Sequence, residues 1–96
     1  DYVLGYPAIQ NDAALRELAK KAAMEAVGAK NVFDAPRLSA SEDFSYYAQV
    51  APTYFMIVGS GDGPPNHNPG FRADDSALLN GVKAEVRIIL DYLNGK

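Results

Sequence analysis

The sequence predicts an α/β domain, and three observations lead to that prediction. Two segments, Ala13–Val27 and Asp75–Asn94, carry apolar residues at helical spacing. A third segment, Thr53–Val58, is a continuous apolar run of β-branched and aromatic residues, as is typical of a strand covered on both faces. With 96 residues the chain is long enough for one small domain and too short for two separate cores.

The composition is that of an ordinary globular protein, and it excludes several classes of function. Hydrophobic residues make up 48% of the chain and charged residues 22%, which argues against disorder. A net charge of −3 gives no support for nucleic-acid binding, because phosphate backbones attract basic surfaces. No apolar run is long enough for a membrane span, and without cysteine there is no disulfide or thiolate ligand. No signal peptide is recognisable, and such a signal would be lost if the chain is a fragment of a longer protein. We expect a cytoplasmic protein that binds neither nucleic acid nor membrane.

The first expected elements are a strand and a helix. Asp1–Pro7 reads as a short strand that the proline ends, and its abrupt start indicates a chain that begins inside a longer protein. Asn11 or Asp12 can cap the helix predicted over Ala13–Val27, which is rich in strong helix formers. Gly28 follows where a left-handed C-cap is favoured.

The middle of the chain predicts a brief strand and a second helix. Asn31–Phe33 is the short strand candidate. Ser39 and Glu42 have the spacing of a capping box, and Ser41 is a competing N-cap. The helix that they would start is expected to run to about Val50, shortly before a proline.

A buried strand, a long loop and a final helix complete the expected order β-α-(β)-α-β-α. The strand is Thr53–Val58, and the loop Gly59–Arg72 holds four glycines and three prolines. Asp74 or Asp75 can cap the last helix and Gly95 can end it. Its predicted apolar face consists of Leu78, Val82, Val86, Ile89 and Leu93.

The loop after the buried strand contains the only histidine, His67, between prolines. In open α/β sheets, ligands bind at the carboxyl ends of the strands, and neutral imidazole is the commonest metal ligand. A lone histidine is more often a surface or hydrogen-bonded residue, and zinc needs three or four ligands. The residues alone therefore leave both interpretations of His67 open.

Three further groups of residues are possible site candidates by their composition. The cluster Ser41-Glu42-Asp43 is either a helix cap or a polar group at a helix N-terminus that holds an anionic substrate, and both can be true. The glycines of Gly59–Gly63 do not form a phosphate loop, because no lysine and no helix follow them directly. Tyr46 and Tyr47 are expected to pack beside the core strand.

Three stretches, in this order, resemble the peptidase M20 amidohydrolases. They are Tyr6-Pro7 with Asn11-Asp12 before a helix, the run Ser41–Tyr47, and His67–Phe71 followed by Asp74-Asp75 and a long terminal helix. The branch that they resemble includes bacterial N-acyl-amino-acid hydrolases, hippurate hydrolase and plant auxin-conjugate hydrolases. The resemblance covers nearly the whole chain.

For the fold, this resemblance implies part of a three-layer α/β/α metallopeptidase-like catalytic domain. Residues 1–7 would be the last strand of an inserted lid domain, which commonly mediates dimerisation, and residues 8–96 the C-terminal part of the catalytic domain. The expected partners are the remainder of the parent chain and a second copy in a homodimer.

For the chemistry, the resemblance implies hydrolysis of the amide bond of an N-acyl amino acid by metal-activated water. His67 would be a metal ligand, and Ser41 and Glu42 would lie near the substrate or behind the ligands. Two divalent ions (zinc, manganese, cobalt or nickel) are expected in the parent. The other ligands and the catalytic glutamate would lie upstream, so this chain would hold no catalytic residue, bind no metal tightly and be inactive alone. The alternative is a free-standing α/β binding or regulatory module without catalysis.

Overall fold

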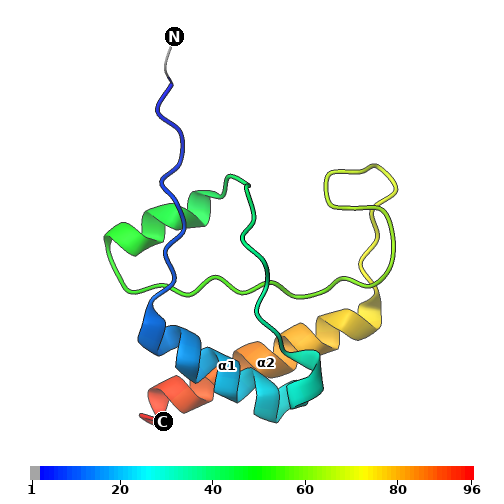
Figure 1. The fold of residues 1–96 in the computed structure, drawn as a ribbon. Coiled ribbons are helices and arrows are strands. Elements are labelled where there is room, and N and C mark those ends of the chain that lie inside the picture. Colours follow the sequence, from blue (N-terminus) through cyan, green and yellow to red (C-terminus); the bar gives the residue numbers. More distant parts are fainter. Residues whose placement is uncertain (1–2) are drawn as a thin grey trace.

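The computed structural model describes residues 3–96 and consists of helices joined by long extended segments (Figure 1). The two α-helices are α1, Ala13–Val27, and α2, Asp75–Leu93. Two 3-10 helices, η1 at Ala29–Asn31 and η2 at Asp43–Gln49, lie between them in the chain. Within residues 3–96 there is no strand, so the predicted α/β/α architecture is not present in this chain by itself.

Helix α1 begins and ends where the sequence predicts. The Asp12 carboxylate accepts a hydrogen bond from the Leu15 N–H at 2.9 Å, which satisfies one of the free donors of the first turn. At the other end the Gly28 N–H donates to the Met24 carbonyl, and the positive φ of Gly28, 91°, turns the chain away from the helix axis. Asp12, rather than Asn11, is the N-cap.

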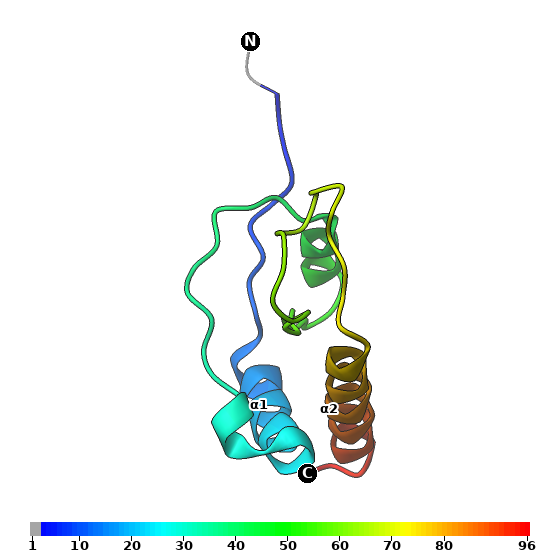
Figure 2. The ribbon, with the colours of Figure 1, turned by 90° about the vertical axis from the view of Figure 1, so that its right-hand side faces the viewer.

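The two α-helices lie side by side and contact each other (Figure 2). The buried apolar residues among those described are three alanines of α1 and one of α2: Ala19, Ala22, Ala23 and Ala84. Methyl groups allow the two backbones to approach closely. Arg87 of α2 spans the pair, because its guanidinium contacts both Glu25 of α1 and Asp91 of α2.

The structure confirms the predicted boundaries of α2, but the apolar face predicted for this helix is not buried. Asp74 caps its first turn, and Asn94 and Gly95 follow its last residue. The predicted face remains half exposed, with Leu78 at 55%, Val82 at 57% and Ile89 at 56%. A helix of this pattern needs a broad apolar layer to cover its stripe, and α1 together with the extended segments of residues 3–96 leaves these side chains about half exposed. No helix among residues 3–96 is long and apolar enough to cross a membrane.

The prediction of three strands is wrong for residues 3–96, because none of the three segments forms a strand there. Asp1 and Tyr2 lie outside the described residues, and Val3–Pro7 is extended without a partner strand. Asn31–Phe33 overlaps η1, since the turn that begins at Gly28 continues into a 3-10 helix. Thr53–Val58 is extended but has no second strand with which to form a ladder. A strand requires a hydrogen-bonded neighbour, and propensity alone does not provide one.

The segment Thr53–Val58 nevertheless lies against the helix pair. It runs across the helix pair in Figure 1, and Val58 contacts α2 at Gly81, where an added Cβ would lie 3.5 Å from each of the two Val58 methyl carbons. Its start is tied to the N-terminus of α1, because the Asp12 N–H donates to the Thr53 carbonyl at 2.8 Å. The helix pair therefore covers one side of the segment.

The second predicted helix is shorter and tighter than expected. It is the 3-10 helix η2, and Glu42 is its N-cap instead of Ser39 or Ser41, because the Glu42 carboxylate accepts from the Phe44 N–H at 3.2 Å. Aromatic rings hold η2 in place. Phe44 lies 5.3 Å from Phe55 and 5.4 Å from Tyr47, and Tyr46 meets Tyr6 edge-on at 5.7 Å, all distances between ring centroids.

Candidate functional site

His67 lies at the exposed end of a loop that joins the extended segment to α2. We call residues 60–74 the His67 loop. Its turns are built by local hydrogen bonds: the Asn68 N–H donates to the Pro65 carbonyl, the Phe71 N–H to the Asn68 carbonyl, and the Gly70 N–H to Asn68 Oδ1 at 2.8 Å. The His67 side chain is therefore carried outward on a loop with its own internal order.

The backbone of His67 has a left-handed conformation. Its φ is 65°, and it is the only non-glycine residue with positive φ among those described. Histidine is one of the side chains found more often in this region, which still costs about 1–2 kcal/mol. The His67 N–H donates to Asn66 Oδ1 at 3.1 Å, so a neighbouring side chain helps to hold this conformation. The imidazole stands in an exposed position, where it is accessible to a ligand.

Ser41 and Glu42 precede η2, and the structure gives them different environments. Ser41 is exposed, whereas Glu42 is partly buried and one of its carboxylate oxygens accepts the bond that caps η2. The capping role of Glu42 is thus present in the structure. Its second oxygen makes no hydrogen bond within residues 3–96.

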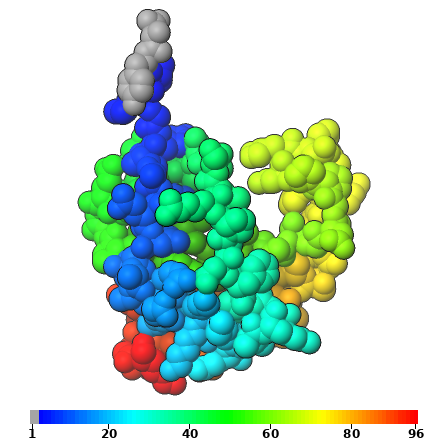
Figure 3. Space-filling model, in the orientation of Figure 1, coloured from blue at the N-terminus to red at the C-terminus, as the bar shows by residue number. Residues whose placement is uncertain are grey.

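The structure places these candidates on the same side of the molecule but does not join them. In Figures 1 and 3 the His67 loop and the segment before η2 both extend away from the helix pair, with an open hollow between them. No hydrogen bond or ion pair within residues 3–96 connects His67 to Ser41 or Glu42. Over the same residues, no group of three or more His, Cys, Asp or Glu side chains could hold a metal ion. Within residues 3–96, the structure therefore does not assemble a metal site around His67.

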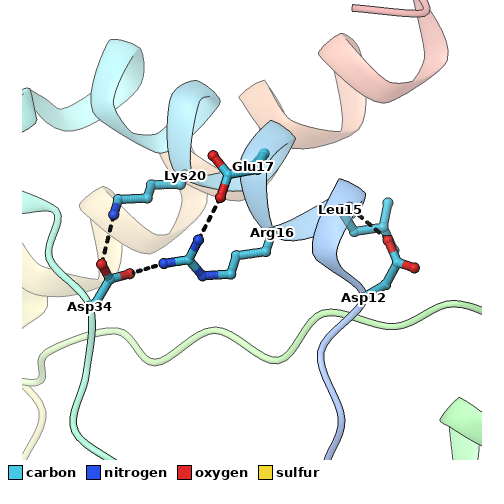
Figure 4. Close-up of polar contacts among 6 residues, drawn as sticks. All are labelled: Asp12, Leu15, Arg16, Glu17, Lys20 and Asp34. Atoms are coloured by element: carbon cyan, nitrogen blue, oxygen red, sulfur yellow. Dashed lines mark hydrogen bonds and ion pairs between the residues drawn. The ribbon is translucent and has the colours of Figure 1, made fainter.

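An ion-pair network holds the segment that leads to Ser41 against α1 (Figure 4). The Asp34 carboxylate accepts from Arg16 at 2.6 Å and from Lys20 at 2.8 Å, and Arg16 also pairs with Glu17. The hydrogen bond from Lys20, and then that from Arg16, hold the pKa of Asp34 below its ordinary value. No local sequence pattern indicates this contact, because its partners are 14 and 18 residues apart in the chain.

Two other residues of this region were not singled out by sequence reasoning as parts of the site. Asn11 hydrogen-bonds the backbone of Phe55 through its side-chain amide. Ser45, in η2, is 2% exposed, and its hydroxyl has no hydrogen-bond partner among the described residues. Both residues lie where η2, the start of α1 and the extended segment meet.

Comparison with known proteins identifies the family. Residues 1–91 match the peptidase family M20/M25/M40, and the chain belongs to this family. No solved structure matches the chain.

Three of the relatives are named as two hydrolases and a deacetylase, and each of these is several times longer than this chain. A probable hydrolase of Synechocystis sp., sll0100, is 40% identical over an alignment of 89 residues that covers 85% of this chain and 22% of the relative. The IAA-amino acid hydrolase ILR1-like 6 of Arabidopsis thaliana is 30% identical over 95 residues, 94% of this chain and 20% of that protein. The N-acetyl-L-cysteine deacetylase of Bacillus subtilis is 33% identical over 75 residues, 78% of this chain and 18% of that protein. The chain thus spans about a fifth of the length of these relatives.

Proposed function

We propose that this chain is the C-terminal part of a metal-dependent amidohydrolase that cleaves the amide bond of N-acyl amino acids or related conjugates. The observation that carries the proposal is the family match over residues 1–91, combined with an exposed histidine on the loop that follows the apolar segment. The names of two relatives, an IAA-amino acid hydrolase and an N-acetyl-L-cysteine deacetylase, describe amino-acid conjugates as substrates of those proteins. They support the same substrate class here.

His67 is the residue of this chain that would bind metal. Its imidazole is exposed and can offer a nitrogen lone pair, and the left-handed backbone at φ 65° fixes the direction in which the side chain leaves the loop. When bound, divalent metal ions would activate water and polarise the scissile carbonyl. The remaining ligands, and the glutamate that moves the proton, would come from other parts of the longer protein.

Ser41 and Glu42 would border the substrate pocket across the hollow from the His67 loop. Glu42 has a carboxylate oxygen that is not used in capping η2, and this oxygen can accept a hydrogen bond from a substrate N–H or from a ligand histidine. The Ser41 hydroxyl is exposed and can both donate and accept. Their role would be to orient the substrate or a ligand, without bond-making chemistry of their own.

In the longer protein, Thr53–Val58 would be a strand of a sheet between helix layers, with residues 1–7 ending a lid domain and residues 8–96 closing the catalytic domain. The half-exposed side chains of α2, including Val86 at 50% and Leu93 at 74%, support this arrangement, because they would be covered by the rest of the catalytic domain. A homodimer through the lid is part of the same proposal.

The test is hydrolysis of a panel of N-acetyl, N-benzoyl and indole-acetyl amino acids by the full-length protein, before and after exhaustive chelation. We expect release of free amino acid from at least one conjugate class, loss of that activity on chelation, and its return when zinc, manganese, cobalt or nickel is added back. Full activity after verified metal removal would contradict the proposal. So would a metal-loaded protein that cleaves no amide in the panel.

A further inference from the structure

The His67 loop is attached to the rest of the molecule at a single narrow point. Residues 61–73 are all exposed, and every hydrogen bond that they make within the described part of the chain stays inside the loop. The loop is closed by one backbone bond, in which the Asp74 N–H donates to the Ser60 carbonyl at 2.7 Å. We call Ser60, Gly61 and Asp74 the neck of the loop.

At the neck, Gly61 is packed against Asp74 so closely that no side chain fits between them. A Cβ added to Gly61 would lie 2.9 Å from the Asp74 Cβ, which is closer than real Cβ atoms approach other atoms. The φ of Gly61 is 93°, a backbone conformation that favours glycine. Both the space and the conformation therefore require glycine at this position.

Asp74 cannot move aside without disturbing α2. Its Oδ1 accepts hydrogen bonds from the Ser76 N–H at 2.8 Å and from the Ser76 hydroxyl at 2.7 Å, which is the N-cap of the helix. These bonds also hold the pKa of Asp74 below its ordinary value, so the carboxylate is ionised at neutral pH and the cap is intact. The neck joins the end of the apolar segment directly to the start of α2.

We infer that Gly61 and Asp74 are positioning residues for His67: the close approach of Gly61 to Asp74 fixes where the His67 loop leaves the helix layer, and hence where the imidazole meets the rest of the metal site. This inference rests on the proposed function, because it takes His67 to be a metal ligand. The closure of the neck itself depends only on the contacts of Gly61 and Asp74 described above. A side chain at position 61 must open the neck, and the displacement is carried to the end of the loop. Residues that orient metal ligands typically change metal affinity about 10–100-fold when they are altered.

The experiment compares three glycine-to-alanine variants of the full-length protein. Gly61→Ala fills the neck. Gly63→Ala, in the same loop, is the control for loop composition, because nothing lies within 4 Å of the added Cβ. Gly28→Ala is the control for backbone strain and general stability. The φ of Gly28, 91°, is close to that of Gly61, but Gly28 lies outside the His67 loop, and the nearest atom to its added Cβ is Asn31 Nδ2 at 3.6 Å.

Two readouts are needed: zinc affinity by competition with a chelator, and hydrogen–deuterium exchange of the peptide that contains Asp74. We expect Gly61→Ala to weaken zinc binding about 10–100-fold and to speed exchange at Asp74. Gly63→Ala should leave both unchanged, and Gly28→Ala should lower only the melting temperature. Equal zinc affinity in Gly61→Ala and Gly63→Ala would overturn the inference while leaving the proposed function intact. An equal loss in Gly28→Ala would also overturn it. A wild-type protein that binds no metal would overturn the proposed function and this role of the neck together, although exchange at Asp74 would still report whether the neck is closed.

Discussion

The side-chain amide of Asn11 exchanges two hydrogen bonds with the backbone of Phe55, as a residue of a neighbouring strand would. The Phe55 N–H donates to Asn11 Oδ1 at 2.8 Å, and Asn11 Nδ2 donates to the Phe55 carbonyl at 3.3 Å. With the bond from the Asp12 N–H to the Thr53 carbonyl, this pairing satisfies one edge of the extended segment at its start. On the other edge, the backbone groups of Tyr54 and Met56 have no backbone partner within residues 3–96.

Replacing Asn11 should therefore loosen the start of the apolar segment. In Asn11→Ala both bonds to Phe55 are lost, and we expect a destabilisation of about 0.5–1.5 kcal/mol with faster amide exchange at Phe55. Asn11→Asp keeps the acceptor and loses the donor, so its effect should be intermediate. Gln10→Ala, an exposed neighbour, is the matched control. If Asn11→Ala and Gln10→Ala show the same exchange at Phe55, the pairing does not contribute to the stability of the segment.

The buried face of α1 should not tolerate a larger side chain. Ala22 is 0% exposed on this face, and enlarging a packed site typically costs about 1–3 kcal/mol. We expect Ala22→Leu to lower the melting temperature of the full-length protein clearly. Ala14→Leu, on the exposed side of the same helix, should have little effect. Equal melting temperatures for the two variants would show that the helices are not packed as described.

At Ser45, in contrast, we expect a substitution that does not lower the melting temperature. Its buried hydroxyl has no partner within residues 3–96, and an unsatisfied buried polar group is a cost that alanine removes. Ser45→Ala should therefore leave the melting temperature unchanged or raise it, whereas Ser45→Val should lower it because the site is full. A marked loss of stability in Ser45→Ala would mean that the hydroxyl has a partner in the complete protein.

The sequence predicted the helices well because their determinants are local. Asp12 and Gly28 bracket α1 within a few residues, and Asp74 does the same for the start of α2. The strand prediction at Thr53–Val58 recognised the apolar character of the segment correctly, but a ladder depends on a distant neighbour that no local pattern supplies. For the same reason, the pairing of Asn11 with Phe55, which are 44 residues apart, could not be predicted from the sequence.

The candidate site was predictable only in part. His67 could be singled out as the only histidine, in a loop after an apolar run, but its left-handed backbone could not be foreseen. Neither could the neck: Gly61 is one of several glycines in that loop, and only the proximity of Asp74 distinguishes it. A helix cap at Ser41-Glu42-Asp43 was predicted as one of two alternatives, but the N-cap is Glu42 instead of Ser39 or Ser41, and the helix is a 3-10 helix.

Acid should selectively weaken the attachment of the segment after η1. The folded pKa of Asp34 lies below its ordinary value of 3.8, mainly through the hydrogen bond from Lys20. A depressed carboxylate pKa contributes stability that is present above the unfolded pKa and is lost as the pH falls through the folded pKa. The difference in melting temperature between wild type and Asp34→Asn should therefore be present at pH 7 and vanish below the folded pKa. Asp62→Asn is the control, because the Asp62 carboxylate makes no ion pair within residues 3–96. If the melting temperatures of wild type and Asp34→Asn differ by the same amount at pH 7 and at pH 3, the ion-pair network does not stabilise the protein as described.

The isolated 96-residue chain should bind zinc weakly, because it contributes one imidazole where a tight site uses three or four ligands. Its exposed apolar side chains and open segment edge should also make it self-associate. Zinc titration by calorimetry and light scattering would check both expectations. A monodisperse monomer with submicromolar zinc affinity would mean that the chain forms a complete site by itself.

The most direct test of the account is the metal content of the full-length protein with and without the His67 imidazole. Metal per chain should be measured by mass spectrometry after gel filtration for wild type and His67→Ala. Asp62→Asn is the control in the same exposed loop, because the Asp62 side chain makes no hydrogen bond or ion pair within residues 3–96. We predict bound divalent metal in the wild type and the control, and a clear reduction in His67→Ala at an unchanged melting temperature of the metal-free protein. Wild-type metal content in His67→Ala would contradict the assignment of His67 as a ligand.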